Sequence, residues 1–260
     1  MRLRRIKYTL YSLIIILISS MIINNCQAKP KRFEKEIPKI SFVFLRHGTT
    51  DWAIEKTSDG FVDYGLNAQG RAESLAAARI IKAKFSNPVF YCSILARTME
   101  TCTIVGNFIQ SNNIHLVVDL RGREFGDVKS IFSKLVRLSK EKKFEEMETI
   151  LPASAESKEE FEFRCLNALF EVLNKHRERC QTIIIVSHDE VFRCFTQHLI
   201  NKTFPMKKGG IKLFKYDYGH WFIQDIENSK SEAHFELTQC DNRPQEQEAV
   251  MRRLVINCLK

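Results

Sequence analysis

The stretch "ISFVFLRHGTTDW" at residues 40–52 joins a strongly apolar run to an abrupt polar ending. Its first part is rich in β-branched and aromatic residues, which is typical of a strand covered on both faces of a sheet. Arg46, His47 and Gly48 then follow in direct succession. Because open α/β sheets bind ligands at the carboxyl ends of their parallel strands, this ending predicts a site. The glycine allows the backbone to approach whatever is bound there.

A second stretch, "TIIIVSHDE" at residues 182–190, repeats this pattern of an apolar, β-branched run that ends in a histidine. If the two strands are neighbours in the sheet, His47 and His188 face one pocket, with Arg46 beside the first of them. A single histidine at such a place is more often structural. Two histidines with an arginine favour a functional site.

The rest of the chain alternates strands with helices, which predicts a three-layer α/β/α sandwich with a mostly parallel central sheet and an antiparallel edge strand. Asn67 is expected to cap one helix, and Ser157 with Glu160 to form a capping box on another. Alternating residues around Tyr218-Gly219 predict an antiparallel hairpin at the sheet edge. The other expected elements are strands at 89–93 and 114–120 and helices at 66–85, 94–110, 128–150, 157–179 and 191–200.

The N-terminal 28 residues have the layout of an export signal: a basic start, an apolar run over 8–23, and a plausible cleavage site after Ala28. An uncleaved membrane anchor over 8–23 is the alternative, because the run is long for a signal core. Either way the chain is expected outside the cytoplasm, periplasmic or secreted. Residues 29–39 are interpreted as a linker, and 40–260 as one domain. Much of the formal net charge of +9 stands in the basic start, so the charge does not predict nucleic-acid binding.

The chain has eight cysteines and no C-x-x-C pair, so no zinc or disulfide framework is predicted. Most of them fall in apolar patterns and are interpreted as small core residues. Cys240 and Cys258 could form a disulfide in an oxidising compartment.

Six segments in order resemble the histidine phosphatase superfamily, in its phosphoglycerate-mutase-like branch. They span about residues 40–224 and include "LRHGTT" (45–50), "GFVDYGLNAQGRAES" (60–74), "CSILARTMETC" (92–102), "ESKEEFEFR" (156–164), "VSHDEVFR" (186–193) and the hairpin "FKYDYGHWFI" (214–223).

The resemblance implies that His47 is a nucleophile that carries a phosphohistidine. It also implies a phosphate pocket made of Arg46, Arg97, His188 and Thr50. The chemistry agrees, because a neutral imidazole can attack phosphorus and a planar guanidinium matches the oxygens of a phosphoryl group. His188 would add positive charge if it were protonated. No metal and no cofactor is expected.

The general acid is where the chain departs from the family pattern. In "DLRGREFGDV" (119–128), Gly122 stands where the family usually has a glutamate, and Glu124 comes two residues later. Asp189, directly after His188, resembles the aspartate of the acid phosphatase branch. Strand-end geometry favours Asp189, whereas Glu124 requires a rearranged loop. Glu190 is interpreted as a helix-start charge.

These residues predict an exported, metal-independent phosphomonoesterase that acts on a small phosphorylated substrate or a phosphoprotein. A cap at 128–157 is expected to select the ester. Ala53, where many relatives carry an asparagine, is expected to weaken phosphate binding without abolishing the chemistry. The alternatives are a membrane-tethered binding module that has lost its acid, and a phosphoglycerate-type mutase, which the leader disfavours.

Overall fold

The computed structural model describes residues 32–51, 63–141, 143–177 and 181–226. The described residues from Phe33 to Ile226 belong to one compact unit. The predicted leader, the anchor at 8–23, Ala53, Cys240 and Cys258 all lie outside the described residues. None of the described helices is long and apolar enough to cross a lipid bilayer.

A six-stranded sheet forms the centre of the domain, in the order β3-β2-β4-β1-β5-β6. The first four strands along the chain pair in parallel, and the last two form the antiparallel hairpin. This confirms the predicted mixed sheet with an antiparallel edge. The strands are β1 (Phe42–Arg46), β2 (Val89–Ser93), β3 (Ile114–Val117), β4 (Ile183–Ser187), β5 (Ile211–Asp217) and β6 (His220–Asp225).

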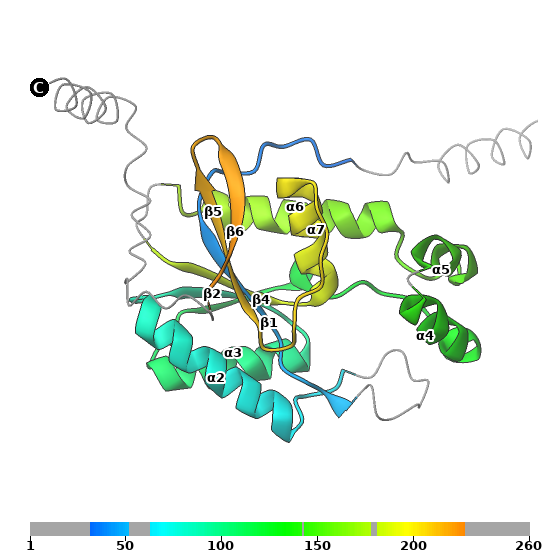
Figure 1. Ribbon diagram of the computed structural model, residues 1–260, viewed down its shortest axis with the longest axis horizontal. Helices are drawn as coiled ribbons and strands as arrows, with labels where there is room; N and C mark the ends of the chain where they lie inside the picture. The colour runs from blue at the N-terminus through cyan, green and yellow to red at the C-terminus, as the bar shows by residue number, and fades with distance from the viewer. Residues whose placement is uncertain (1–31, 52–62, 142, 178–180, 227–260) are drawn as a thin grey trace, which may run out of the picture. The chain divides into compact units, whose positions relative to one another are not determined.

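Helices cover both faces of the sheet, as Figure 1 shows, with α2 (Ala68–Lys84) and α3 (Ala96–Ile109) on one side and α6 (Lys158–Asn174) and α7 (Asp189–Ile200) on the other. The side chains of β1 alternate between the two layers. Phe42 and Phe44 join the core under α6 and α7, while Val43 and Leu45 join the core under α2 and α3. All four are fully buried, as the apolar run predicted.

The two predicted helix caps are confirmed. The side chain of Asn67 accepts a hydrogen bond from the Gly70 amide, 2.9 Å away, and Ser157 with Glu160 forms the expected capping box. Tyr218 and Gly219 make the hairpin turn with φ angles of 47° and 83°. The apolar periodicity and polar caps of these segments were sufficient to place them.

Strand β3 is shorter than predicted, because the chain leaves the sheet after Val117 and forms a 3₁₀ turn at Val118–Leu120. At the sheet edge Leu116 and Val118 are exposed, whereas Leu120 is fully buried. The turn brings the carbonyl of Leu120 within 2.6 Å of the Ser187 hydroxyl, which donates to it. This bond ties the following segment, residues 119–126, to the end of β4.

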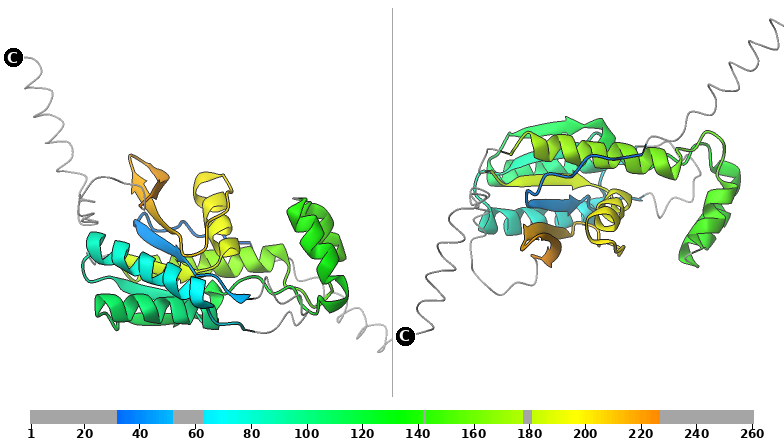
Figure 2. Two further views of the ribbon diagram at one scale, coloured as in Figure 1. Left: turned by 60° about the horizontal axis from the view of Figure 1, so that its bottom comes forward. Right: turned by 90° about the horizontal axis from the view of Figure 1, so that it is seen from above.

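The predicted single helix over 128–150 is divided into a 3₁₀ turn at Lys129–Ile131 and two short helices, α4 (Phe132–Lys140) and α5 (Phe144–Ile150), which lie in the predicted cap. They pack against each other and stand beside the sandwich, outside its layers (Figure 2). Arg123 connects them to the 119–126 segment, because its guanidinium binds the Glu148 carboxylate and the Glu156 carbonyl.

Two glycines explain how the loop after β1 packs on helix α2. A Cβ placed on Gly48 would overlap the Gly70 carbonyl, and one placed on Gly70 would overlap the Thr49 carbonyl. Both obstacles are backbone atoms, which cannot rotate away. Thr49 also binds the Glu73 carboxylate through its amide, at 2.8 Å. The glycines therefore allow the loop that carries His47 to lie directly on the helix.

Gly70→Ala is expected to lower the free energy of unfolding by about 3 kcal/mol, because the added methyl group forces two backbone segments apart. Urea unfolding monitored by circular dichroism measures the change. Gly122→Ala is the matched control, since its nearest neighbour would lie at an ordinary 3.6 Å. Equal stability losses in the two variants would contradict this packing.

Candidate active site

The pairing of β1 with β4 brings the two predicted histidines together. Arg46 lies opposite Ser187 in the parallel register, so His47 and His188 leave adjacent strands at the same level. Their ring centroids are 5.1 Å apart, and the rings are tilted by 58°. His47 is 7% exposed and His188 is 1% exposed. The sheet therefore forms the predicted two-histidine site.

Main-chain hydrogen bonds hold the His47 backbone in place. Its amide donates to the Ser187 carbonyl at 3.0 Å, and its carbonyl accepts from the Gly209 amide at 3.1 Å. The second bond comes from the loop at 206–210, which follows α7. The backbone of His47 is thus held by both β4 and this loop, leaving its ring as the part that can meet a ligand.

The ring of His47 is in the tautomer that suits a nucleophile. Its Nδ1 lies 2.7 Å from the carbonyl oxygen of Gly48. Because a carbonyl oxygen only accepts hydrogen bonds, Nδ1 carries the proton, and the lone pair is on Nε2. The nitrogen farther from the backbone is therefore the one free to attack.

Both imidazoles are neutral in this environment. Burial lowers the pKa of His47 to about 3, and the positive charges of Arg97, Arg46 and Lys208 act in the same direction. Burial likewise lowers the pKa of His188 well below 6.5, with Arg97 as the next cause. The lowered pKa of His188 favours its neutral form in the ligand-free protein. The arginines are the principal positive groups near the pair.

Arg97 lies in the first turn of α3, and its side chain is 23% exposed. Its guanidinium is 3.5 Å from the Asp63 carboxylate. Burial lowers the pKa of Arg97, and the nearby carboxylates of Glu190 and Asp63 raise it. These neighbours place Arg97 between the histidine pair and two acidic side chains.

Arg46 turns toward the loop at 206–210, where its Nη1 donates to the Met206 carbonyl and lies 3.3 Å from Asp189. Its Nε and the Nδ1 of His188 are buried and have no hydrogen-bond partner among the described residues. The other ring nitrogen of His188 is paired with the Ser93 hydroxyl at 3.0 Å. Unpaired buried polar atoms are rare, so these two can serve a bound group.

Neither predicted general acid is free. Asp189 accepts from the Met206 amide and from Arg193 Nε, both at 2.8 Å, in addition to its contact with Arg46. Its carboxylate thus joins three elements of structure. Glu124 is 55% exposed and pairs with Arg121 at 2.7 Å.

A buried ion pair holds the segment at 119–126 against the site. The carboxylate of Glu156 binds Arg164 through both of its oxygens, and each side chain is only 10% exposed. The same guanidinium donates to the carbonyls of Asp119, Arg121 and Gly122. This network fixes the path of the segment, so the backbone at Gly122 is held next to the histidine pair.

Gly122 borders the histidine pair, as the distances from an ideal Cβ built on its backbone show. Such an atom would lie 3.6 Å from Cγ of His188 and 3.8 Å from Nη2 of Arg97. The same point is 3.8 Å from Oε2 of Glu190. A carboxylate from α7 therefore reaches the place at which the family pattern has a glutamate.

Three residues that contribute to the site were not predicted from the sequence. Ser93 ends β2 beside His188, Lys208 acts electrostatically on His47, and Glu190 reaches Gly122. Their positions depend on the neighbouring strands and loops. Only the "HDE" triplet was a visible signal, and it was interpreted as a helix start. Glu190 does lie in the first turn of α7. Thr50, predicted in the phosphate pocket, is 6% exposed.

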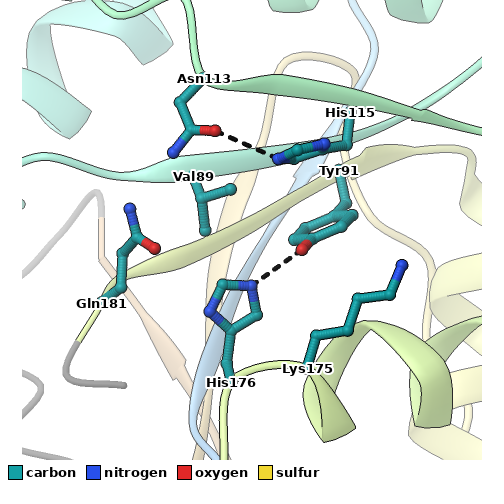
Figure 3. Close-up of a pocket in the computed structure, with 7 residues that line it drawn as sticks. All are labelled: Val89, Tyr91, Asn113, His115, Lys175, His176 and Gln181. Atoms are coloured by element: carbon teal, nitrogen blue, oxygen red, sulfur yellow. Dashed lines mark hydrogen bonds between the residues drawn. The ribbon is translucent and has the colours of Figure 1, made fainter. Parts of the chain in front are cut away.

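A second hollow lies at the opposite end of the parallel strands (Figure 3). There the Tyr91 hydroxyl is 2.8 Å from Nε2 of His176, and His115 is 3.1 Å from Asn113. No arginine lines it, so it does not resemble the histidine site. Its lining residues are Val89, Tyr91, Asn113, His115, Lys175, His176 and Gln181.

Comparison with known proteins identifies the family of the chain. The family model of the histidine phosphatase superfamily, branch 1, matches residues 42–229. The chain belongs to the histidine phosphatase superfamily. This match covers every strand of the sheet and both strand-end histidines. It confirms the resemblance drawn from the six sequence segments.

The relatives include mutases, and the similar structures include phosphatases. The chain is 27% identical to phosphoglycerate mutase-like protein 4 of Arabidopsis thaliana, over 74% of this chain and 87% of that protein. It is 26% identical to the 2,3-bisphosphoglycerate-dependent phosphoglycerate mutase of Bartonella henselae, over 61% of this chain and 81% of that protein. A mycobacterial glucosyl-3-phosphoglycerate phosphatase has the same fold, with a TM-score of 0.57, 18% identity, and coverage of 72% of this chain and 97% of that chain.

Because the fold keeps His47 unprotonated, the protein should become less stable in acid as the unfolded chain takes up a proton there. The unfolded chain binds a proton at His47 near pH 6.5 whereas the folded chain does not, so the free energy of unfolding falls as the pH drops from 7 to 5. His47→Gln removes this contribution. Its loss of stability between pH 7 and 5 is expected to be smaller than that of the unmodified chain by about 2 kcal/mol.

Urea unfolding at the two pH values, in buffers without phosphate, measures this difference. The change His115→Gln at an exposed histidine is the control for the loss of an imidazole. If His47→Gln and the unmodified chain lose the same stability, His47 is not held neutral by the fold.

Proposed function

We propose that this protein is a phosphatase that hydrolyses phosphate monoesters through a phosphohistidine on His47. One observation carries the proposal: a buried, neutral imidazole with a free Nε2 stands 5.1 Å from a second neutral histidine, within the field of two arginines. A nucleophile without charge and a positive surrounding are what attack on a phosphate anion requires.

In the first step Nε2 of His47 attacks the phosphorus, and the bond from phosphorus to the ester oxygen breaks. The leaving oxygen takes its electron pair and requires a proton. Arg46 and Arg97 stabilise the charge that spreads over the three phosphoryl oxygens. The unpaired nitrogens of Arg46 and His188 can donate hydrogen bonds to the same oxygens once the anion displaces water.

In the second step water attacks the phosphohistidine, and the N–P bond breaks. The water gives up a proton to the base that was the acid of the first step, inorganic phosphate is released, and His47 returns to its starting form. Two displacements in sequence replace one difficult hydrolysis. The chain's own side chains supply nucleophile and charge, so we propose that the reaction requires no metal. Among the described residues no group of three or more histidine, cysteine or acidic side chains is arranged so that it could hold a metal ion.

A mutase is the second candidate, because curated relatives carry that name. A mutase would return the phosphoryl group from His47 to a bound monophosphate, so water must be excluded. Formation of 2-phosphoglycerate from 3-phosphoglycerate with 2,3-bisphosphoglycerate as primer distinguishes this activity from release of inorganic phosphate. A binding module without catalysis would leave both substrates unchanged.

We propose a small phosphorylated molecule as substrate. Proteins of the same fold that are named for such substrates include the mycobacterial phosphatase above and a phosphoserine phosphatase of Entamoeba histolytica, with a TM-score of 0.56, 21% identity, and coverage of 72% of this chain and 95% of that chain. Helices α4 and α5 are suited to select the ester, since Arg123 and Glu148 link them to the segment that carries Gly122. A phosphoprotein remains an alternative substrate for the same chemistry.

The full chain, in mild detergent where needed and without added metal, is expected to hydrolyse p-nitrophenyl phosphate. His47→Ala should lower kcat/KM by about 10⁴-fold, because the attacking atom is lost. Arg97→Met should lower it by about 10²-fold or more, because the phosphoryl oxygens lose a charged partner. The release of nitrophenol is followed by its absorbance at 405 nm. For the unmodified chain, kcat/KM is expected to be ~10³ M⁻¹s⁻¹ or above.

The control is Arg71→Met, which removes another arginine that is paired with a carboxylate but lies on α2 and is exposed. Its kcat/KM should stay unchanged. Full activity in His47→Ala would eliminate the phosphohistidine mechanism. Inactivity of the unmodified chain on every phosphate ester tried would favour the binding module.

We propose further that the N-terminal segment directs the domain out of the cytoplasm. The basic start, the apolar run over 8–23 and the site after Ala28 support this proposal. Cell fractionation and mass spectrometry of the purified chain test it. A chain that begins at Lys29 in the exported fraction indicates cleavage, and an intact chain in membranes indicates an anchor. An intact chain found with soluble cytoplasmic proteins would exclude both.

A further inference from the structure

We propose that Glu190 donates the proton to the leaving oxygen, in place of the glutamate that is absent at Gly122. This inference rests on the proposed phosphatase function. Oε2 of Glu190 lies 3.8 Å from the point that a Cβ of residue 122 would occupy, and His188 and Arg97 border the same point. The carboxyl group thus reaches this side of the pocket from helix α7 and not from the 119–126 segment.

The fold explains why Glu190 can reach this place. His188 is the N-cap of α7, and Glu190 is the second residue of that helix. The side chain therefore starts within two residues of the histidine pair. A Cβ at position 122 would lie 3.8 Å from Oε2, an ordinary contact distance, so the carboxyl group of Glu190 lies directly beside this position.

Glu190 also differs from the other carboxylates near the site in its hydrogen bonds and ion pairs. Within the described part of the chain, no hydrogen bond or ion pair engages its carboxylate, although its charge acts on Arg97. It is exposed, so a leaving group can reach it from solvent. A carboxylate that has no fixed partner can gain and lose a proton without breaking structure.

The other carboxylates near the site are already committed to structure. Asp189 holds Arg46, Arg193 and the Met206 amide, so its protonation would weaken contacts between α7, β1 and the loop at 206–210. Asp63 accepts from the Ala96 amide at 2.7 Å and faces Arg97. Protonation of either carboxylate would break these fixed contacts, whereas Glu190 has no such contact to lose.

Glu124 and Glu156 are engaged farther along the 119–126 segment. Glu124 pairs with Arg121, and Glu156 is locked into the buried pair with Arg164. The main chain joins them, since the Glu156 amide donates to the Glu124 carbonyl at 2.8 Å. Rotation of either side chain toward the pocket would break an ion pair.

While Nε2 of His47 bonds to phosphorus, the ester oxygen takes the electron pair of the breaking P–O bond and the proton of the Glu190 carboxyl. Glu190 is then a carboxylate. It next takes a proton from the water that attacks the phosphohistidine, which restores the starting state and releases inorganic phosphate.

Two aryl phosphates of nearly the same shape test this assignment in the full chain. Phenoxide is a strong enough base to require a proton as it leaves, whereas p-nitrophenoxide departs readily without one. Glu190→Gln should lower kcat/KM for phenyl phosphate by about 10²-fold or more, and that for p-nitrophenyl phosphate by less than about tenfold. Asp189→Asn and Glu124→Gln should affect both substrates by the same factor.

The second step gives an independent readout. Without the base, breakdown of the phosphohistidine slows, so Glu190→Gln should release one equivalent of nitrophenol per site in a burst before a slow steady state. The unmodified chain should show no such burst on the same timescale. The absence of a burst together with equal losses for both substrates would overturn the assignment to Glu190.

A relocated carboxylate tests the position. Gly122 has no positive φ angle, and a Cβ there meets only ordinary contacts, so the double variant Glu190→Gln with Gly122→Glu can be built without strain. It should recover at least about tenfold of the lost kcat/KM for phenyl phosphate. A double variant no better than Glu190→Gln would contradict a proton donor at this side of the pocket.

The outcomes separate the two proposals. If the unmodified chain hydrolyses neither substrate, the phosphatase function fails and the role of Glu190 fails with it. If the unmodified chain is active but Asp189→Asn shows the loss that is selective for phenyl phosphate, the function stands and the assignment to Glu190 is wrong.

Discussion

The parallel pairing of β1 with β4 is the constraint on which the whole site depends. Its register sets Arg46 beside Ser187, so the next residue on each strand is a histidine at the same height. A shift by one residue would move the two rings to different levels and turn the side chains of β1 toward the wrong layers. Phe42 and Phe44 on one face and Val43 and Leu45 on the other prevent such a shift, because each is buried in its own core.

Burial at these strand ends has an electrostatic consequence. Both imidazoles stay neutral, and positive charge is provided by arginines that carboxylates hold in place. Asp189 orients Arg46, Asp63 faces Arg97, and Glu156 neutralises Arg164. The arginines are therefore partly neutralised in the ligand-free protein. A phosphate anion can compete for those that border the pocket and can engage the buried nitrogens that lack a partner among the described residues.

Much of the fold could be predicted from local patterns. The apolar runs, the Asn67 cap, the Ser157 capping box and the Tyr218-Gly219 turn each act within a few residues, and all are observed. The end of β3 at Val117 was not predicted, because burial of Leu120 and its bond to Ser187 are long-range effects. The interpretation of Cys92, Cys102, Cys165 and Cys194 as buried core residues is confirmed.

The sequence by itself determined the family, the two histidines and the two arginines, because these lie in short motifs at strand and helix ends. Only the tertiary structure decided which carboxylate lies beside Gly122 without a fixed partner. Asp189 and Glu190 are adjacent in the chain, yet one is bound on both oxygens while the other reaches the space beside Gly122. The difference arises from loops at 119–126 and 206–210, which are distant in sequence and are brought to the site by the ion pair at Arg164 and by the strand order of the sheet.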